Sequence, residues 1–335
     1  MFPVQRPRRL RTSGPLRELV AETRLHPSQV VAPMFVREGI DAPQPITSLP
    51  GVVQHTLTSL VAEAKVLADL GVGALILFGI PSSKDSIGSK AFAPEGIVQA
   101  GLEELQVAVG DRMVVMADLC VDEYTDHGHC GILDGRGSVD NDRTLEVYAK
   151  IAVAQARAGA HVVAPSGMMD GQVGVIRQAL DAEGFTEVAI LAYSAKYASG
   201  LYGPFREAVE VEIAGGGNRK GYQQDWRNAR EALVEVHADI AQGADMVMVK
   251  PAISYLDVIA AVRSSVDVPV AAYHVSGEYS MLKAAAANGW IDHDVVAMEH
   301  LTAIRRAGAD IILTYLARWF AEHHHGILHQ EVSGS

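Results

Sequence analysis

Val188-Ala-Ile-Leu-Ala-Tyr-Ser-Ala-Lys196 is an apolar run of strand length that ends in a lysine, and Asp245-Met-Val-Met-Val-Lys250 is a second such run. Both are almost continuously apolar instead of alternating with polar residues, which is typical of parallel strands covered on both faces. Six further runs have the same character: Val30–Val36, Ala74–Ile80, Met113–Cys120, His161–Ser166, Val268–Ser276 and Asp310–Tyr315. The sequence therefore predicts eight buried parallel strands.

Amphipathic segments of helical length separate these runs: Leu57–Leu70, Arg143–Ala158, Asp225–Gln242 and Asp294–Ala307. Each is followed by a glycine, which favours the end of a helix: Gly71, Gly159, Gly243 and Gly308. Eight alternating strand–helix units predict an α/β protein with a (β/α)8 barrel of the TIM type. A doubly wound open sheet is the alternative, but no glycine-rich phosphate turn follows the first strand. We expect an N-terminal arm over residues 1–29, a catalytic barrel over 30–320 and a C-terminal tail over 321–335.

Bulk composition excludes several classes of protein. The 335 residues are 49% hydrophobic and carry a net charge of −12, which disfavours binding to nucleic acid or to an anionic membrane surface. No apolar stretch is long enough to span a membrane, and the arginine-rich N-terminus lacks the apolar core of a secretion signal. The chain has two cysteines, Cys120 and Cys130, which fits a reducing cytoplasm better than a disulfide framework.

The predicted strand ends carry polar side chains that can do chemistry. Barrels of this type have their active sites at the carboxyl ends of the strands, where this chain places Asp118, Cys120, Ser166, Lys196, Lys250, Ser276 and Tyr315. The alternative for each side chain by itself is an ordinary hydrogen bond at a strand end, and a single lysine can extend its amine into solvent. Because they meet at one barrel mouth, we expect them to form one site.

Two buried lysines in one pocket predict Schiff-base chemistry. Burial and mutual repulsion lower the pKa of an amine, and the neutral amine attacks a ketone to form an imine. One lysine indicates a class I aldolase, whereas Lys196 and Lys250 together indicate two ketone substrates joined side by side.

A glycine-rich segment follows Lys196 and resembles a mobile lid. It contains Tyr202-Gly-Pro-Phe-Arg206 and Gly215-Gly-Gly-Asn-Arg219-Lys-Gly-Tyr-Gln223. Arg206 and Arg219 are suited to clamp a carboxylate with paired hydrogen bonds. A solvated surface loop is the alternative.

The loop Cys120-Val-Asp122-Glu-Tyr-Thr-Asp-His-Gly-His-Cys130 predicts a metal site. Two thiolates and a carboxylate supply three ligands and leave a position open, as in catalytic zinc sites. Two buried free cysteines are the alternative.

Several motifs resemble those of one family, porphobilinogen synthase, also called 5-aminolevulinate dehydratase. They are Tyr193-Ser-Ala-Lys-Tyr-Ala-Ser, Tyr202-Gly-Pro-Phe-Arg, Met248-Val-Lys-Pro-Ala, Tyr273-His-Val-Ser-Gly-Glu and Ala164-Pro-Ser-Gly-Met-Met-Asp-Gly. The resemblance runs from about Val30 to Phe320. It implies a (β/α)8 lyase of tetrapyrrole (haem) biosynthesis that condenses two 5-aminolevulinate molecules into porphobilinogen with loss of two waters. It also implies a homo-octamer joined by N-terminal arms, with a hexamer or dimer as alternatives.

The resemblance assigns roles residue by residue. Lys250 and Lys196 match the lysines of the two substrate sites. Ser276 and Tyr315 match the groups that hold the carboxylate of the substrate on Lys250, and Arg206, Arg219 and Gln223 match those for the substrate on Lys196. Asp118 and Ser166 match polar groups near an amine, and Tyr202, Phe205 and Tyr273 match aromatic walls.

The resemblance also implies metals. Zinc-dependent relatives have Cys-x-Cys…Cys where this chain has Cys120, Asp122 and Cys130, and two soft thiolates still favour zinc over magnesium. His129 is an alternative ligand. Glu235 matches a glutamate of an allosteric magnesium site at subunit contacts, with a solvated helix glutamate as the alternative. The other functions considered are a class I aldolase, which would need a phosphate site after the last strands, and a degenerate barrel that only binds.

Overall fold

Eight parallel strands form a closed barrel in the computed structural model, which describes residues 2–214 and 217–324. In barrel order they are β1 (Val30–Arg37), β4 (Ala74–Ile80), β5 (Val114–Leu119), β6 (Val162–Pro165), β7 (Ala189–Lys196), β8 (Met246–Lys250), β9 (Val270–His274) and β10 (Ile311–Thr314). β10 pairs with β1 through Val30 opposite Ile312 and Val31 opposite Leu313, which closes the ring. The predicted barrel is confirmed, and the open doubly wound sheet is excluded.

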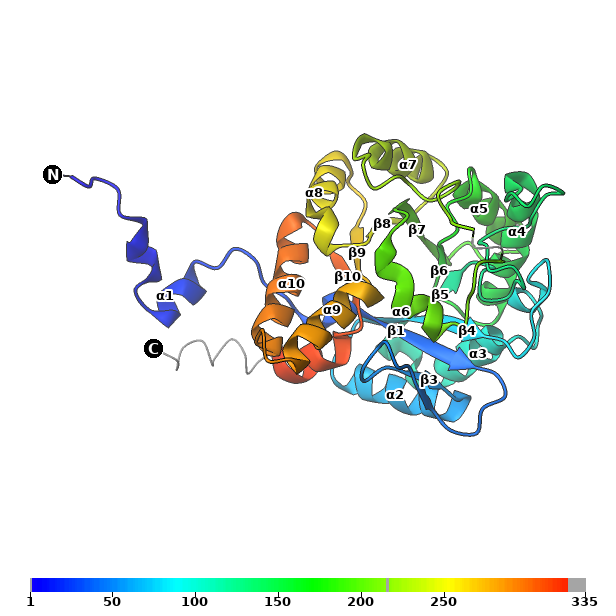
Figure 1. The fold of residues 1–335 in the computed structure, drawn as a ribbon, viewed down its shortest axis with the longest axis horizontal. Coiled ribbons are helices and arrows are strands. Elements are labelled where there is room, and N and C mark those ends of the chain that lie inside the picture. Colours follow the sequence, from blue (N-terminus) through cyan, green and yellow to red (C-terminus); the bar gives the residue numbers. More distant parts are fainter. Residues whose placement is uncertain (1, 215–216, 325–335) are drawn as a thin grey trace.

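Helices surround the barrel (Figure 1). They are α2 (Leu57–Asp69), α3 (Ile97–Val109), α4 (Asn141–Arg157), α5 (Gln172–Ala182), α6 (Gly203–Ala208), α7 (Arg230–Ala241), α8 (Leu256–Ser265), α9 (Ser276–Ala287) and α10 (His293–Ala307). Short 3-10 helices are η2 (Pro27–Gln29), η3 (Ser89–Ala91), η4 (Gly110–Arg112), η5 (Gly200–Tyr202) and η7 (Ile253–Tyr255), and residues 317–324 are also helical. The four glycines predicted to end helices all have positive φ, the left-handed conformation that stops a helix.

Two details of the prediction need correction. The helix expected from Asp225 begins at Arg230, because the Asp225 carboxylate accepts the backbone N–H of Arg227 and holds the chain in a turn. The short strands β2 (Gln44–Pro45) and β3 (Val53–His55) extend the sheet beside β1 and were not predicted. Strands of two or three residues are too short to produce a readable hydrophobic pattern.

The N-terminal segment stands away from the barrel (blue in Figure 1). It contains η1 (Pro7–Arg11) and α1 (Gly14–Leu19), neither of which buries a residue in its own chain. Within the described ranges, no helix combines the length and apolarity needed to cross a membrane. Of the predicted tail, residues 325–335, including His325, lie outside the described residues.

Candidate active site

Lys196 and Lys250 lie opposite each other at the carboxyl ends of β7 and β8. Each is only 5% exposed to solvent, so neither extends its amine into water. Lys250 Nζ lies 4.3 Å from the ring centre of Tyr273, 5.0 Å from Tyr193, 5.3 Å from Phe205 and 5.4 Å from Tyr202. Four aromatic rings, which we call the aromatic cage, therefore enclose this amine. Tyr193 is the member that the sequence analysis did not single out.

An irregularity in β7 places Tyr193 and Lys196 on the same face of the sheet. Successive side chains of a regular strand point to opposite faces, so residues three apart normally face opposite ways. Between Ala192 and Ala195 the pairing register with β8 shifts, so that three steps along β7 match two steps along β8. This one-residue bulge turns Lys196 toward the interior, where it joins Tyr193.

The bulge is held from outside the barrel by helix α7. The Ser194 hydroxyl hydrogen-bonds to the buried carboxylate of Asp239 on α7, and burial raises the pKa of Asp239 to about 6. Gln224 Nε2 donates to the Ser194 carbonyl oxygen at 3.3 Å. The position of Lys196 thus depends on contacts outside the active site.

We expect Asp239→Ala to destabilise the fold by about 1–3 kcal/mol, because it leaves the buried Ser194 hydroxyl with only a long bond of 3.4 Å to the Ala192 carbonyl oxygen. Asp239→Asn retains a side-chain oxygen and should recover most of the loss. Urea unfolding measures the free-energy change. If Asp239→Ala unfolds at the same urea concentration as the wild type, Asp239 does not support the bulge.

The environment of Lys250 favours a neutral amine. Burial, and then the charge of Lys196, lower the pKa of Lys250 to about 7, although Asp118 opposes this shift. Lys196 Nζ donates a hydrogen bond of 2.6 Å to the Ser166 carbonyl oxygen at the end of β6. The structure therefore gives the two amines different surroundings within one pocket.

Asp118 lies close to both lysines at the end of β5. Burial raises the pKa of Asp118 to about 6, and Lys196 and Lys250 counteract the effect of burial. The Ser166 hydroxyl donates to Asp118 Oδ2 at 3.0 Å, whereas Oδ1 is buried and has no partner among the described residues. The predicted pair of Asp118 and Ser166 is therefore adjacent, with one carboxylate oxygen still available.

Ser276 and Tyr315 lie on the β9–β10 side of the mouth. Ser276 Oγ accepts the Phe205 backbone N–H at 3.0 Å, and the Tyr315 and Tyr273 hydroxyls are 3.3 Å apart. Gly277 permits this arrangement, because a Cβ there would lie 2.5 Å from the Leu201 carbonyl oxygen. These contacts place both predicted carboxylate-binding hydroxyls beside the aromatic cage.

Arg206, Arg219 and Gln223 lie on the segment that follows β7. Arg219 donates at 2.7 Å to Asp122 Oδ2 and at 2.9 Å to the Gly128 carbonyl oxygen. Burial lowers the pKa of the Arg206 guanidinium, and the positive charge of nearby Arg219 lowers it further. Gln223 Nε2 is buried without a partner in the described chain. Gly215 and Gly216 of the predicted lid lie outside the described residues.

Cys120, Asp122 and Cys130 converge on one point. Their ligand atoms all lie within 4.8 Å of one another, and all three residues are buried. Both cysteines are free. The hydrogen bond between the thiols lowers the pKa of Cys130, while burial raises that of Cys120. Although burial opposes it, Arg219 keeps the pKa of Asp122 below its usual range. Two sulfurs and an ionised carboxylate can hold a divalent cation.

Two tyrosines support this cluster and were not predicted. The Tyr148 hydroxyl donates to the Cys130 carbonyl oxygen at 2.6 Å and lies 3.6 Å from Cys120 Sγ. The Tyr222 hydroxyl accepts the Cys130 backbone N–H at 3.3 Å and lies 3.1 Å from His129 Nδ1. Tyr222 belongs to the predicted lid segment, but the sequence does not show that it or Tyr148 contacts the cysteine loop. His129 stands outside the three-residue cluster.

Glu235 lies on α7 and is not part of the cysteine cluster. Burial, followed by Asp239, Asp170 and Glu231, raises the pKa of Glu235 to about 7. Asp170, Glu231 and Glu235 line the same cavity of about 680 Å³. Over the described part of the chain, Glu235 belongs to no group of three ligands as tight as the cysteine cluster.

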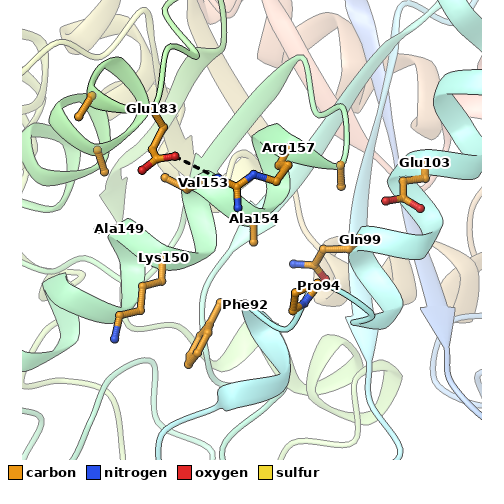
Figure 2. Close-up of a pocket in the computed structure, with 13 residues that line it drawn as sticks. Phe92, Pro94, Gln99, Glu103, Ala149, Lys150, Val153, Ala154, Arg157 and Glu183 are labelled. Carbon is orange, nitrogen blue, oxygen red and sulfur yellow. Dashed lines mark hydrogen bonds and ion pairs between the residues drawn. The ribbon is translucent and has the colours of Figure 1, made fainter.

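Another cavity, of about 550 Å³, lies on the outside of the barrel (Figure 2). α3, α4 and α5 supply most of its lining, which includes the Arg157–Glu183 ion pair and Lys150 near the Phe92 ring. No predicted site residue lines it. The polar side chains at the strand ends therefore lie at the barrel mouth and not in this outer cavity.

Comparisons with known proteins agree with this geometry. The model of the family "Delta-aminolevulinic acid dehydratase" matches residues 4–323. The delta-aminolevulinic acid dehydratase of Streptomyces coelicolor is 59% identical over 94% of this chain and 96% of its own. That of Mycobacterium tuberculosis strain CDC 1551 is 58% identical over the same shares. A crystal structure of delta-aminolevulinic acid dehydratase (porphobilinogen synthase) from Toxoplasma gondii ME49, in complex with the reaction product porphobilinogen, has a TM-score of 0.94 and 42% identity, covering 96% of this chain and 92% of that one.

Proposed function

The chain belongs to the delta-aminolevulinic acid dehydratase family, and from this premise we propose how its residues carry out the reaction. It is a hydro-lyase that condenses two molecules of 5-aminolevulinate into porphobilinogen, with loss of two waters, in porphyrin biosynthesis. The observation that carries the mechanism is the pairing of Lys196 with Lys250 across β7 and β8. A class I aldolase needs only one such lysine, and the second amine then has no role.

Each lysine holds one substrate as an imine. The Lys250 amine, kept partly neutral by burial and by the charge of Lys196, attacks the ketone of one molecule. Ser276 and Tyr315 bind the carboxylate of this molecule, since their hydroxyls lie beside the same cage. Two reactants held on adjacent strands react as if in one molecule, which lowers the entropic part of the barrier.

The substrate on Lys196 uses the opposite side of the pocket. Arg206, Arg219 and Gln223 bind its carboxylate, and the unpartnered Gln223 amide supports this assignment. Asp118 and Ser166 hold its amino group, because Asp118 Oδ1 is buried without a partner. Arg219 also contacts Asp122, so this arginine links the substrate site to the metal cluster.

Cys120, Asp122 and Cys130 would hold zinc. Two thiol sulfurs favour zinc over magnesium, and three protein ligands leave a position open. When bound, zinc supplies a Lewis acid and lowers the pKa of a bound water. Tyr148 and Tyr222 position the Cys130 loop, and Arg219 neutralises part of the charge on Asp122.

Glu235 would contribute to an allosteric magnesium site. Magnesium prefers carboxylate and water oxygens, and the mutual repulsion near Glu235 favours a cation there. Since the carboxylates near Glu235 form no tight group within the described residues, further ligands would come from water or a partner subunit.

Assembly as a homo-octamer is also part of the proposal. The N-terminal arm buries no residue of η1 or α1 in its own chain and exposes Phe2 and Leu19, which favours contacts with another subunit. Two free cysteines support a location in the reducing cytoplasm.

A direct assay tests the activity. Purified protein incubated with zinc and 5-aminolevulinate should produce a pyrrole that p-dimethylaminobenzaldehyde detects and that mass spectrometry identifies as porphobilinogen. Substrate consumption without this pyrrole would contradict the function.

The rate of imine formation at Lys250 should depend on pH. A lysine of pKa about 7 is mostly protonated, and therefore not nucleophilic, below that pH. We expect the rate constant for borohydride-trapped adduct at Lys250 to fall about tenfold between about pH 8 and about pH 6. Quenched-flow mass spectrometry measures it.

Lys196→Met provides the matched control, since it removes the second cause of the pKa shift of Lys250. The midpoint of the pH profile should move upward in this variant. A wild-type rate that keeps rising up to about pH 10, as for an ordinary lysine, contradicts the prediction.

A further inference from the structure

Tyr193 differs from the other tyrosines of the aromatic cage in its hydroxyl group. The Tyr202 hydroxyl donates to the Tyr197 carbonyl oxygen at 2.8 Å, and the Tyr273 hydroxyl lies 3.3 Å from that of Tyr315. The Tyr193 hydroxyl is buried and makes no hydrogen bond of ordinary length among the described residues, and the Asp118 carboxylate is the group that interacts with it. A buried polar group without an ordinary hydrogen bond costs about 1–3 kcal/mol, so its retention needs a reason outside the resting fold.

Tyr193 also lies near both amines. Its ring centre is 5.5 Å from Lys196 Nζ and 5.0 Å from Lys250 Nζ. Burial raises the pKa of the Tyr193 phenol, and the Asp118 carboxylate raises it further through its charge and a hydrogen bond. The bulge in β7 is the feature that brings Tyr193 and Lys196 to the same face.

We propose that Tyr193 is a catalytic residue shared by both lysines, whose hydroxyl moves a proton from nitrogen to oxygen during imine formation. This role rests on the function proposed above. When a neutral amine attacks the ketone, a C–N bond forms and the C=O π electrons move to oxygen, which leaves a positive nitrogen and a negative oxygen. The phenol donates its proton to that oxygen and accepts one from the nitrogen. A neutral carbinolamine results, and the phenol is regenerated.

Tyr193→Phe tests this role because it keeps the ring and removes only the hydroxyl. Wild-type and variant holoenzymes are mixed with 5-aminolevulinate, quenched with borohydride at intervals and analysed by peptide mass spectrometry. We expect the rate constants for adducts at both Lys196 and Lys250 to fall by about 100-fold or more, the usual scale for losing a proton-transferring group. Tyr197→Phe, which removes a phenol hydroxyl that donates to the Asn228 carbonyl oxygen at 3.0 Å, is the control and should keep the wild-type rates.

A second measurement separates catalysis from structure. 5-Aminopentanoate has the substrate's carboxylate and amine but no ketone, so its affinity reports binding alone. The Tyr193→Phe protein should bind it as the wild type does. If the variant does not fold, 3-fluorotyrosine incorporated at position 193 acidifies the phenol and should change both rate constants.

Either adduct forming at the wild-type rate in Tyr193→Phe overturns the shared role, as does a loss of 5-aminopentanoate affinity equal to the loss of rate. With 3-fluorotyrosine at position 193, unchanged rates overturn it too. The wild-type measurement distinguishes the two proposals, because a wild type that forms no adduct at either lysine overturns the two-imine mechanism itself.

Discussion

Lys250→Met should reduce the rate of porphobilinogen formation by roughly four orders of magnitude, the scale at which an enzyme loses its covalent nucleophile. Methionine fills a similar volume among the four rings of the aromatic cage but has no amine. The fold should therefore persist, because the change removes a buried cation rather than a packing contact. Lys196→Met should reduce the rate to a similar extent, since each substrate needs its own imine.

Steady-state assays with the pyrrole reagent measure both variants, and thermal unfolding verifies that they fold. Lys150→Met, which changes an exposed lysine near the Phe92 ring on the outside of the barrel, is the control and should keep full activity. Retention of more than about one hundredth of the activity by either active-site variant would mean that its lysine is not a nucleophile.

Removing a ligand of the cysteine cluster is expected to have the second largest effect. Cys130→Ala leaves one thiol and one carboxylate, which should lower zinc affinity by at least about 100-fold, since even indirect contacts to a metal are worth up to that much. Activity at limiting zinc should fall with it. Cys120→Ala should behave in the same way.

Zinc content after dialysis, measured by plasma mass spectrometry, reports this affinity independently of activity. His323→Ala, on the exposed terminal helix, controls for zinc held by histidines near the C-terminus. If Cys130→Ala retains stoichiometric zinc after dialysis, the ligand set is wrong. A chelator should inactivate the wild type, and added zinc should restore it.

The barrel could be predicted from the sequence because its signal is local and repeated. Every barrel strand is an almost continuous apolar run, and each predicted strand end lies within two residues of the observed one. The placement of Lys196 opposite Lys250 follows from the same pattern, since neighbouring parallel strands end at one edge. Short strands such as β3 (Val53–His55) carry no such signal.

The unpredicted features of the site depend on strand pairing or on contacts between segments, neither of which leaves a local sequence pattern. Tyr193 is three residues from Lys196, and a regular strand would place the two on opposite faces, so only the bulge reveals it. The ion pair of Arg219 with Asp122 joins residues that the sequence assigned to separate sites. No local pattern records these distances.

The central claim is that each chain forms two imines at once, and trapping tests it most directly. Protein saturated with 5-aminolevulinate is reduced with borohydride, and its intact mass and peptides are analysed. We expect chains that carry two reduced adducts, one on Lys196 and one on Lys250. Adducts confined to a single lysine, while porphobilinogen is still produced, would contradict it.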